Sequence, residues 1–271
     1  SGYLITSLIL VEKDDNSFSI LSFYERRARR ILPALFVVIL CCVPFAWFWM
    51  TPSQLKDFSQ SIAAVSLFSS NVLFWVESDY FAAAAELKPL LHTWSLAVEE
   101  QYYVFFPALM VLLWRLGKLG LVTVISVLAL FSFILSEFVW RGDPTSFFYV
   151  TPTANFYLLP TRAWELLAGS LIAFYLNTNA QPKGSIGSLL AVLGFVLIMY
   201  AVFFFDGLTP FPGIYALFPV VGTSLIILYA TPNNVVGKLL SAPIFVGIGL
   251  ISYSIYLWHQ PLLSFAKLRS F

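Results

Sequence analysis

Four arginines in five positions form the densest group of charged residues in this chain. They stand in Phe23-Tyr24-Glu25-Arg26-Arg27-Ala28-Arg29-Arg30, directly before a long apolar run. A planar guanidinium group binds phosphate oxygens through two parallel hydrogen bonds, which the ammonium group of lysine cannot do. The pattern therefore predicts a site for a phosphate-rich ligand such as a coenzyme A thioester. The alternative is a positively charged anchor at the cytoplasmic end of a membrane helix. The candidate cofactor-binding residues are Arg26, Arg27, Arg29 and Arg30.

A second candidate site lies in His92-Thr93-Trp94-Ser95-Leu96-Ala97-Val98-Glu99. On a helix, His92 and Glu99 lie two turns apart and project from one face, with Ser95 between them. Ionisable groups this close to hydrocarbon are costly and often mark a functional cavity, so this pair is a candidate for acid–base chemistry. The alternative is a capped, water-facing helix start in which Glu99 complements the helix dipole.

Two further polar groups stand at the ends of apolar helices. Arg162 and Glu165 are three residues apart, which fits either an ion pair at the membrane interface or a role in an internal polar cavity. Ser252, Tyr256 and His259 share one helix face late in the chain. This group fits either a substrate cavity or the aromatic belt of a membrane interface.

The sequence offers little to a metal ion or to a classical hydrolase. It has two histidines, and its two cysteines, Cys41 and Cys42, are adjacent within an apolar run, so we expect neither a zinc site nor a disulfide. It contains no GxSxG sequence and no glycine-rich phosphate loop. The net charge of +1 gives no reason to expect a nucleic-acid partner.

These groups are positioned by a chain with the composition of a membrane protein. Of its 271 residues, 59% are hydrophobic and 11% are charged, against about 45–50% and 25% in soluble domains. Apolar runs near the ~20 residues that cross a bilayer predict seven complete spans, and residues 1–10 would supply half of another. We therefore expect an all-α, polytopic transmembrane helix bundle. The predicted spans are 32–50, 95–114, 120–138, 160–176, 187–205, 213–230 and 243–264.

The distribution of basic residues predicts the orientation of these spans. The segment 58–76 is moderately apolar but rich in serine, and we expect a shallow amphipathic helix there. Nine basic residues then fall in loops on one side and three on the other, which places the loop 11–31 in the cytoplasm. The nine are Lys13, Arg26, Arg27, Arg29, Arg30, Arg115, Lys118, Lys183 and Lys238.

We expect residues 1–271 to be an incomplete piece of one transmembrane domain. The opening apolar stretch is half a span and lacks the basic region and cleavage site of a secretory signal, and the chain stops just after an apolar helix. The sequence shows no internal repeat and no soluble second domain.

Six blocks of this sequence resemble the acyltransferase type 3 family, which comprises integral-membrane O-acyltransferases of bacterial cell-surface glycans. The blocks cover nearly the whole chain in the family's order, and HTWSLAVEEQ and YSIYLWH are the most specific parts. The resemblance is strongest to the branch that modifies lipopolysaccharide O-antigen or related polysaccharides, in which an SGNH domain often follows. The blocks are SGYLIT, FYERRARRILPAL, PLLHTWSLAVEEQYYVFFP, LLPTRAWELLAGSL, FPGIYALFPVVGTSLI and ISYSIYLWHQPLLSF.

The resemblance implies a bundle of about ten helices in the bacterial inner membrane. It would transfer an acetyl group from cytosolic acetyl-CoA to a sugar hydroxyl of a surface glycan or a lipid-linked sugar, with membrane lipid as its other partner. The arginine group would hold the coenzyme A phosphates, and a base and oxyanion donors would serve the acyl transfer. The family's principal catalytic histidine lies before SGYLIT, so we expect this chain alone to be inactive. The catalytic candidates here are His92, Glu99 and Glu165, and the cavity candidates are Arg162, Tyr253, Tyr256 and His259.

The competing function is that of a non-enzymatic transporter or flippase of a lipid-linked glycan. Such a chain is expected to show inverted repeats with paired broken helices, and this sequence shows neither.

Overall fold

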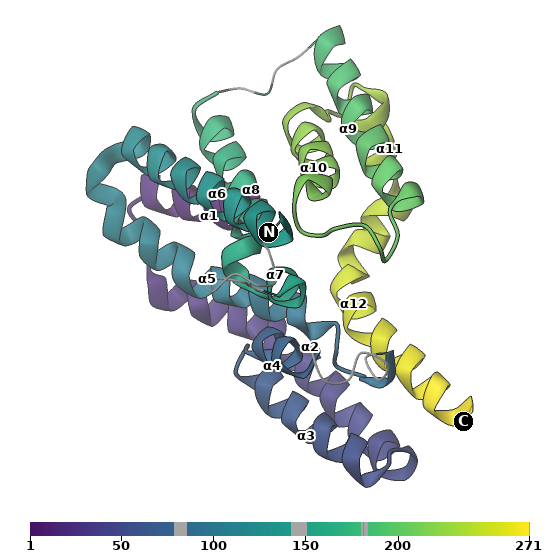
Figure 1. The fold of residues 1–271 in the computed structure, drawn as a ribbon. Helices are drawn as coiled ribbons and strands as arrows, with labels where there is room; N and C mark the ends of the chain where they lie inside the picture. Colours follow the sequence, from purple (N-terminus) through teal and green to yellow (C-terminus); the bar gives the residue numbers. More distant parts are fainter. Residues whose placement is uncertain (79–85, 142–150, 180, 182–183, 271) are drawn as a thin grey trace. The chain divides into compact units, whose positions relative to one another are not determined.

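The computed structural model describes residues 1–78, 86–141, 151–179, 181 and 184–270, so Lys183 of the predicted cytoplasmic loops lies outside the described residues. The described residues fold into helices and contain no strand, which confirms the all-α class (Figure 1). The α-helices are α1 Gly2–Asp14, α2 Ile20–Trp49, α3 Pro52–Ser66, α4 Ser70–Ser78, α5 Thr93–Leu113, α6 Gly117–Arg141, α7 Pro152–Tyr157, α8 Leu159–Thr178, α9 Ser185–Phe204, α10 Leu217–Tyr229, α11 Val235–Leu240 and α12 Pro243–Ser270.

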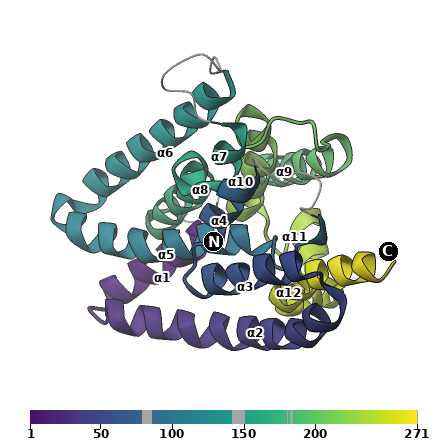
Figure 2. The same cartoon turned by 60° about the horizontal axis from the view of Figure 1, so that its bottom comes forward.

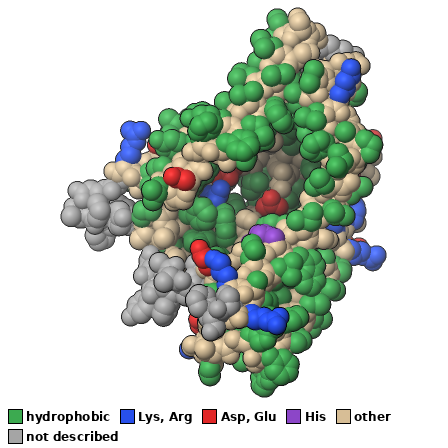
Figure 3. All heavy atoms as spheres, turned by 90° about the vertical axis from the view of Figure 1, so that its right-hand side faces the viewer, with side chains coloured by type: hydrophobic (Ala, Val, Ile, Leu, Met, Phe, Trp, Pro, Cys, Tyr) green, Lys and Arg blue, Asp and Glu red, His purple; other side chains and the backbone are tan. Residues whose placement is uncertain are grey.

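Three segments of the described chain are long and apolar enough to cross a membrane. They are α2, the segment Thr93–Arg141 that contains α5 and α6, and α9. Large hydrophobic side chains on these helices are exposed, Phe48 by 80% and Leu112 by 75%, and hydrophobic side chains are spread over the face shown in Figure 3. A surface of this kind matches hydrocarbon rather than water, so the chain is a helical membrane protein. The larger count of seven complete spans stays a prediction.

One compact unit comprises residues 1–18 and 106–248. Within it, α8 packs against both α1 and α6, and α9 lies beside α10 (Figure 1). Glycines allow the backbones of α9 and α10 to come into close contact. A Cβ atom on Gly194 of α9 would lie 2.6 Å from the carbonyl oxygen of Gly222 in α10. Close packing of small residues is a common way for helices to associate in a membrane.

The second unit comprises residues 19–105 and 249–271, and therefore holds α2, α3, α4, the first part of α5 and most of α12. The helix α3 packs against α2 and α4 (Figure 2). Side-chain hydrogen bonds fasten α4 to the start of α5: the Ser70 hydroxyl donates to the Thr93 carbonyl at 3.0 Å, and the Gln101 amide donates to Asn71 Oδ1 at 2.8 Å.

Two predicted boundaries in the second unit are wrong. The helix α2 begins at Ile20, where the Ser19 side chain accepts a hydrogen bond from the backbone of Ser22, so the arginines lie within a helix rather than in a loop 11–31. The segment 58–76 is not one helix, because α3 ends before Phe68, whose φ of 51° is left-handed and breaks the helix. Neither α3 nor α4 is among the candidate spans.

Candidate active site

Arg27 is the one member of the arginine group that is partly shielded from solvent, and the other three are exposed. Phe23 lies one helical turn before it in α2 and is fully buried. The Arg27 guanidinium lies 5.7 Å from the Phe23 ring centre and 5.2 Å from that of Tyr103 in α5, so it stacks on two aromatic rings. The sequence alone could not distinguish Arg27 from the neighbouring arginines, because they differ only in the side of the helix on which they lie.

The remaining arginines form an exposed cationic stretch on the first half of α2. Arg29 makes an ion pair with Glu25 at 2.6 Å, one turn earlier in the same helix. Arg30 lies within electrostatic reach of Arg27. Together with Arg26, these side chains could hold phosphate oxygens, although Arg29 would have to exchange Glu25 for the ligand.

Two adjacent carboxylates of α5 lie beside Arg27, and only one of them was a candidate from sequence. The Tyr103 hydroxyl donates to Glu99 Oε2 at 3.2 Å. Glu100 is 7% exposed, and its Oε1 makes no hydrogen bond to any described residue. Both carboxylates lie within electrostatic reach of Arg27. Glu100 therefore joins the candidate site. It was not predicted from the sequence, because only the helix face that carries His92 and Glu99 was considered.

His92 lies immediately before α5 and is 8% exposed. Neither of its ring nitrogens makes a hydrogen bond to a described residue. Burial lowers the pKa of His92 to about 3, and the charge of His259 lowers it further, against smaller opposing contributions from the backbone of Pro89 and Leu257. The imidazole is therefore neutral at physiological pH, and its burial opposes protonation.

Tyr256 of α12 links His92 to Ser95. Its hydroxyl donates to the His92 carbonyl at 2.6 Å and lies 2.9 Å from the Ser95 hydroxyl. The ring centres of Tyr256 and His259 each lie 5.0 Å from that of His92. Tyr253, one turn earlier in α12, donates to the Ile31 carbonyl of α2 at 3.1 Å. The second unit thus brings the polar groups of α2, α5 and α12 together.

Arg162 and Glu165 belong to the first unit and form the predicted ion pair between positions three apart. Two guanidinium nitrogens of Arg162 lie 3.2 and 3.3 Å from the two carboxylate oxygens of Glu165. A third hydrogen bond runs from Arg162 to the Phe156 carbonyl at 3.3 Å. The same two side chains also line a cavity of about 290 Å³ within this unit, so both readings of the pair stay compatible with the structure.

Metal ligation finds no support in the described part of the chain, where no three His, Cys, Asp or Glu side chains gather closely enough to hold an ion. Cys41 and Cys42 are both free thiols.

Fold and site together define a helical membrane protein in which a buried histidine and a stretch of arginines lie in the same unit. The chain belongs to the acyltransferase family: the family described as "Acyltransferase domain" matches residues 1–270. No solved structure matches the chain significantly.

Three relatives illustrate what the chain is similar to, and two of them carry acetyltransferase names. A Haemophilus influenzae protein named "Uncharacterized protein" is 34% identical over 243 residues, which is 87% of this chain and 97% of that protein. A "Putative O-acetyltransferase" of Staphylococcus aureus is 32% identical over 285 residues, covering 98% of this chain and 44% of the relative. A "Putative peptidoglycan O-acetyltransferase" of Bacillus subtilis is 32% identical over 279 residues, covering 97% and 42%. The chain thus spans less than half the length of the Staphylococcus and Bacillus relatives.

Proposed function

We propose that this chain is the membrane part of an O-acetyltransferase of the bacterial inner membrane that moves an acetyl group from cytosolic acetyl-CoA to a sugar hydroxyl of a cell-surface polysaccharide. Membership of the acyltransferase family supports the reaction class. The observation that carries the proposal is His92, a buried imidazole whose ring centre lies 5.0 Å from those of Tyr256 and His259, in the same unit as the arginine group. Histidine is the side chain that most often moves a proton in general acid–base catalysis.

The arginine group supports a donor with several phosphates. Arg26, Arg29 and Arg30 are exposed and can reach phosphate oxygens, whereas Arg27 is stacked on aromatic rings beside two carboxylates. Coenzyme A carries phosphates at one end and its thioester at the other. We therefore assign the exposed arginines to the phosphates and Arg27 to the boundary between the cytosolic entrance and the interior of the unit.

The transfer itself exchanges one acyl bond for another. The sugar hydroxyl oxygen attacks the thioester carbonyl carbon, the hydroxyl proton passes to a base, the carbon–sulfur bond breaks, and the coenzyme A thiolate leaves. The resemblance places the family's principal histidine before SGYLIT, so we assign His92 and Glu99 to proton movement and to shaping the site. The Tyr256 hydroxyl, which donates to the His92 carbonyl, holds His92 in place.

The acceptor is a cell-surface glycan, and lipopolysaccharide O-antigen is the one that the sequence blocks favour. The name of the Bacillus relative makes peptidoglycan the main competitor. Acetyl analysis of both polymers from the same cells decides between them. The expected SGNH domain also stays a prediction.

The test is transfer of radiolabelled acetyl from acetyl-CoA to surface glycan in membranes that carry the complete native protein. Arg27→Gln should lower the transfer at least tenfold, because it removes the stacked cation between donor site and interior. Arg115→Gln, which neutralises an exposed arginine outside the site, is the matched control and should retain transfer. Equal transfer by wild type and Arg27→Gln would contradict the role assigned to Arg27 at the boundary of the donor site. Loss of surface glycan itself, without loss of acetylation per sugar, would favour the transporter.

A further inference from the structure

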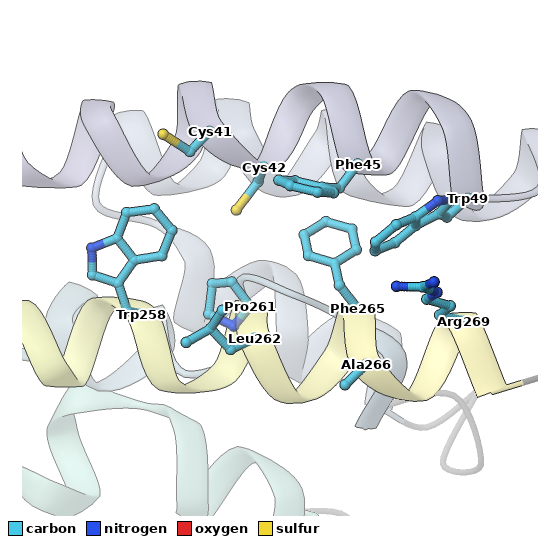
Figure 4. A pocket seen from close by; sticks show the side chains of 10 residues that line it. All are labelled: Cys41, Cys42, Phe45, Trp49, Trp258, Pro261, Leu262, Phe265, Ala266 and Arg269. Carbon is cyan, nitrogen blue, oxygen red and sulfur yellow. The ribbon is translucent and has the colours of Figure 1, made fainter.

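An apolar cavity of about 480 Å³ lies between α2 and α12 within the second unit. Figure 4 shows side chains of both helices pointing into it: Cys42, Phe45 and Trp49 from α2, and Trp258, Phe265 and Arg269 from α12. Its size falls within the ~300–1,000 Å³ of small-molecule sites. None of its lining residues belongs to the candidate active site, so the proposed acetyl transfer does not account for it.

The cavity is apolar along its length and cationic at one end. Near the cationic end, three aromatic rings fill the space between α2 and α12. The ring centres of Phe45 and Trp49 lie 5.7 and 6.0 Å from that of Phe265. The Arg269 guanidinium lies 6.0 Å from the Trp49 ring, and Figure 4 shows the two side chains together at the end opposite Trp258. Tryptophan side chains are enriched at the depth of the bilayer where lipid headgroups lie. A guanidinium group beside an indole ring is attracted to the face of that ring.

We propose that this cavity binds one anionic phospholipid of the surrounding bilayer, with a hydrocarbon chain between α2 and α12 and the headgroup phosphate on Arg269. The apolar walls match the chain, and guanidinium is the side-chain group best suited to a phosphate. Charge complementarity selects the anionic lipid over a second apolar helix, which would leave Arg269 facing hydrocarbon. The neighbouring basic residue of the last turn, Lys267, pairs with Glu86 and does not line the cavity.

The chain offers its own reporters for this site, because Trp49 and Trp258 lie at the two ends of the cavity. The experiment titrates phosphatidylglycerol with brominated chains into the purified chain in detergent micelles and follows tryptophan fluorescence, which bromine quenches on contact. Binding in the cavity gives saturable quenching, and Trp258→Phe removes part of that saturable component. Brominated phosphatidylcholine, whose headgroup has no net charge, should require a severalfold higher concentration for half-saturation.

Two charge variants test the headgroup contact. Arg269→Gln should raise the half-saturating concentration of phosphatidylglycerol about tenfold, which corresponds to about 1.4 kcal/mol for a charged hydrogen bond. Lys267→Gln removes an equal charge in the same turn and should leave it unchanged. Quenching that rises without saturation, as expected if a helix or a second copy fills the cavity, would overturn the proposal. Equal shifts in the two variants would overturn the assignment of the phosphate to Arg269.

Discussion

Acid should destabilise this protein because His92 is buried in its neutral form. Replacing His92 should make the stability of the protein less dependent on pH. In the folded chain, burial lowers the pKa of His92 to about 3, whereas an exposed histidine in the unfolded chain titrates near 6.5. Between these values the unfolded chain binds a proton that the folded chain does not. Stability therefore rises with pH through this window and falls as the pH drops below about 6.5.

The size of the effect follows from the two pKa values. Each pH unit inside the window changes the free energy of unfolding by up to about 1.4 kcal/mol, and the change levels off near pH 7, where His92 is neutral in both states. Between pH 7 and pH 4.5 we expect a loss of about 2–3 kcal/mol from this residue alone. That is a large fraction of the stability of a typical domain.

The assay is thermal unfolding in detergent at a series of pH values for wild type and His92→Gln. The comparison rests on the pH slope of the melting temperature, so a uniform loss of stability in the variant does not affect it. Wild type should lose melting temperature steeply below pH 6.5, and His92→Gln should lose clearly less. His259→Gln is the matched control: it removes one charge that lowers the His92 pKa, so the slope below pH 6.5 should persist while the loss levels off at a higher pH than in wild type. Identical slopes in wild type and His92→Gln would refute the reasoning.

Three further predictions concern single side chains. Tyr256→Phe removes a donor to the His92 carbonyl at 2.6 Å and a contact to Ser95 at 2.9 Å, so chemical denaturation should show a loss of about 1–2 kcal/mol and transfer should fall. Arg27→Lys keeps the charge but loses the planar stack on two rings, so acetyl transfer should fall nearly as far as in Arg27→Gln; full transfer would contradict the stacking role. Gly194→Ala places a Cβ atom 2.6 Å from a carbonyl oxygen of α10 and should cost about 1–3 kcal/mol, whereas Gly247→Ala meets nothing within 4 Å and should be neutral or stabilising.

The sequence was sufficient for the class of fold and for most of the long helices. Continuous apolar runs identified the helices now seen at Thr93–Leu113, Gly117–Arg141 and Ser185–Phe204 to within a few residues. It was insufficient where a boundary depends on one backbone angle or on one cap. The left-handed Phe68 splits the segment 58–76, and Ser19 starts α2 well before its apolar part. The short helices α7 and α11 left no periodic signal long enough to detect.

The sequence also predicted some features of the candidate site and not others. Residue types and spacing singled out the arginine group, the block His92–Glu99 and Tyr256, and the structure places all of them in the second unit. Spacing could not tell which side chain of each group faces inward. Arg27 and Glu100 differ from their neighbours only by helical phase and by the rings packed against them, and Glu100 was overlooked for that reason. The contact of Tyr256 with Ser95 joins residues far apart in the sequence and depends on tertiary packing.

The most direct test of the central claim is acetyl transfer by the complete native protein carrying His92→Gln or Glu99→Gln. Transfer is measured beside wild type at equal membrane levels, with radiolabelled acetyl-CoA and surface glycan. The account predicts transfer by wild type and a loss of at least tenfold in each variant, while the level of glycan at the surface stays constant. Undiminished transfer in both variants would contradict the assignment of proton movement and site shaping to this part of the chain.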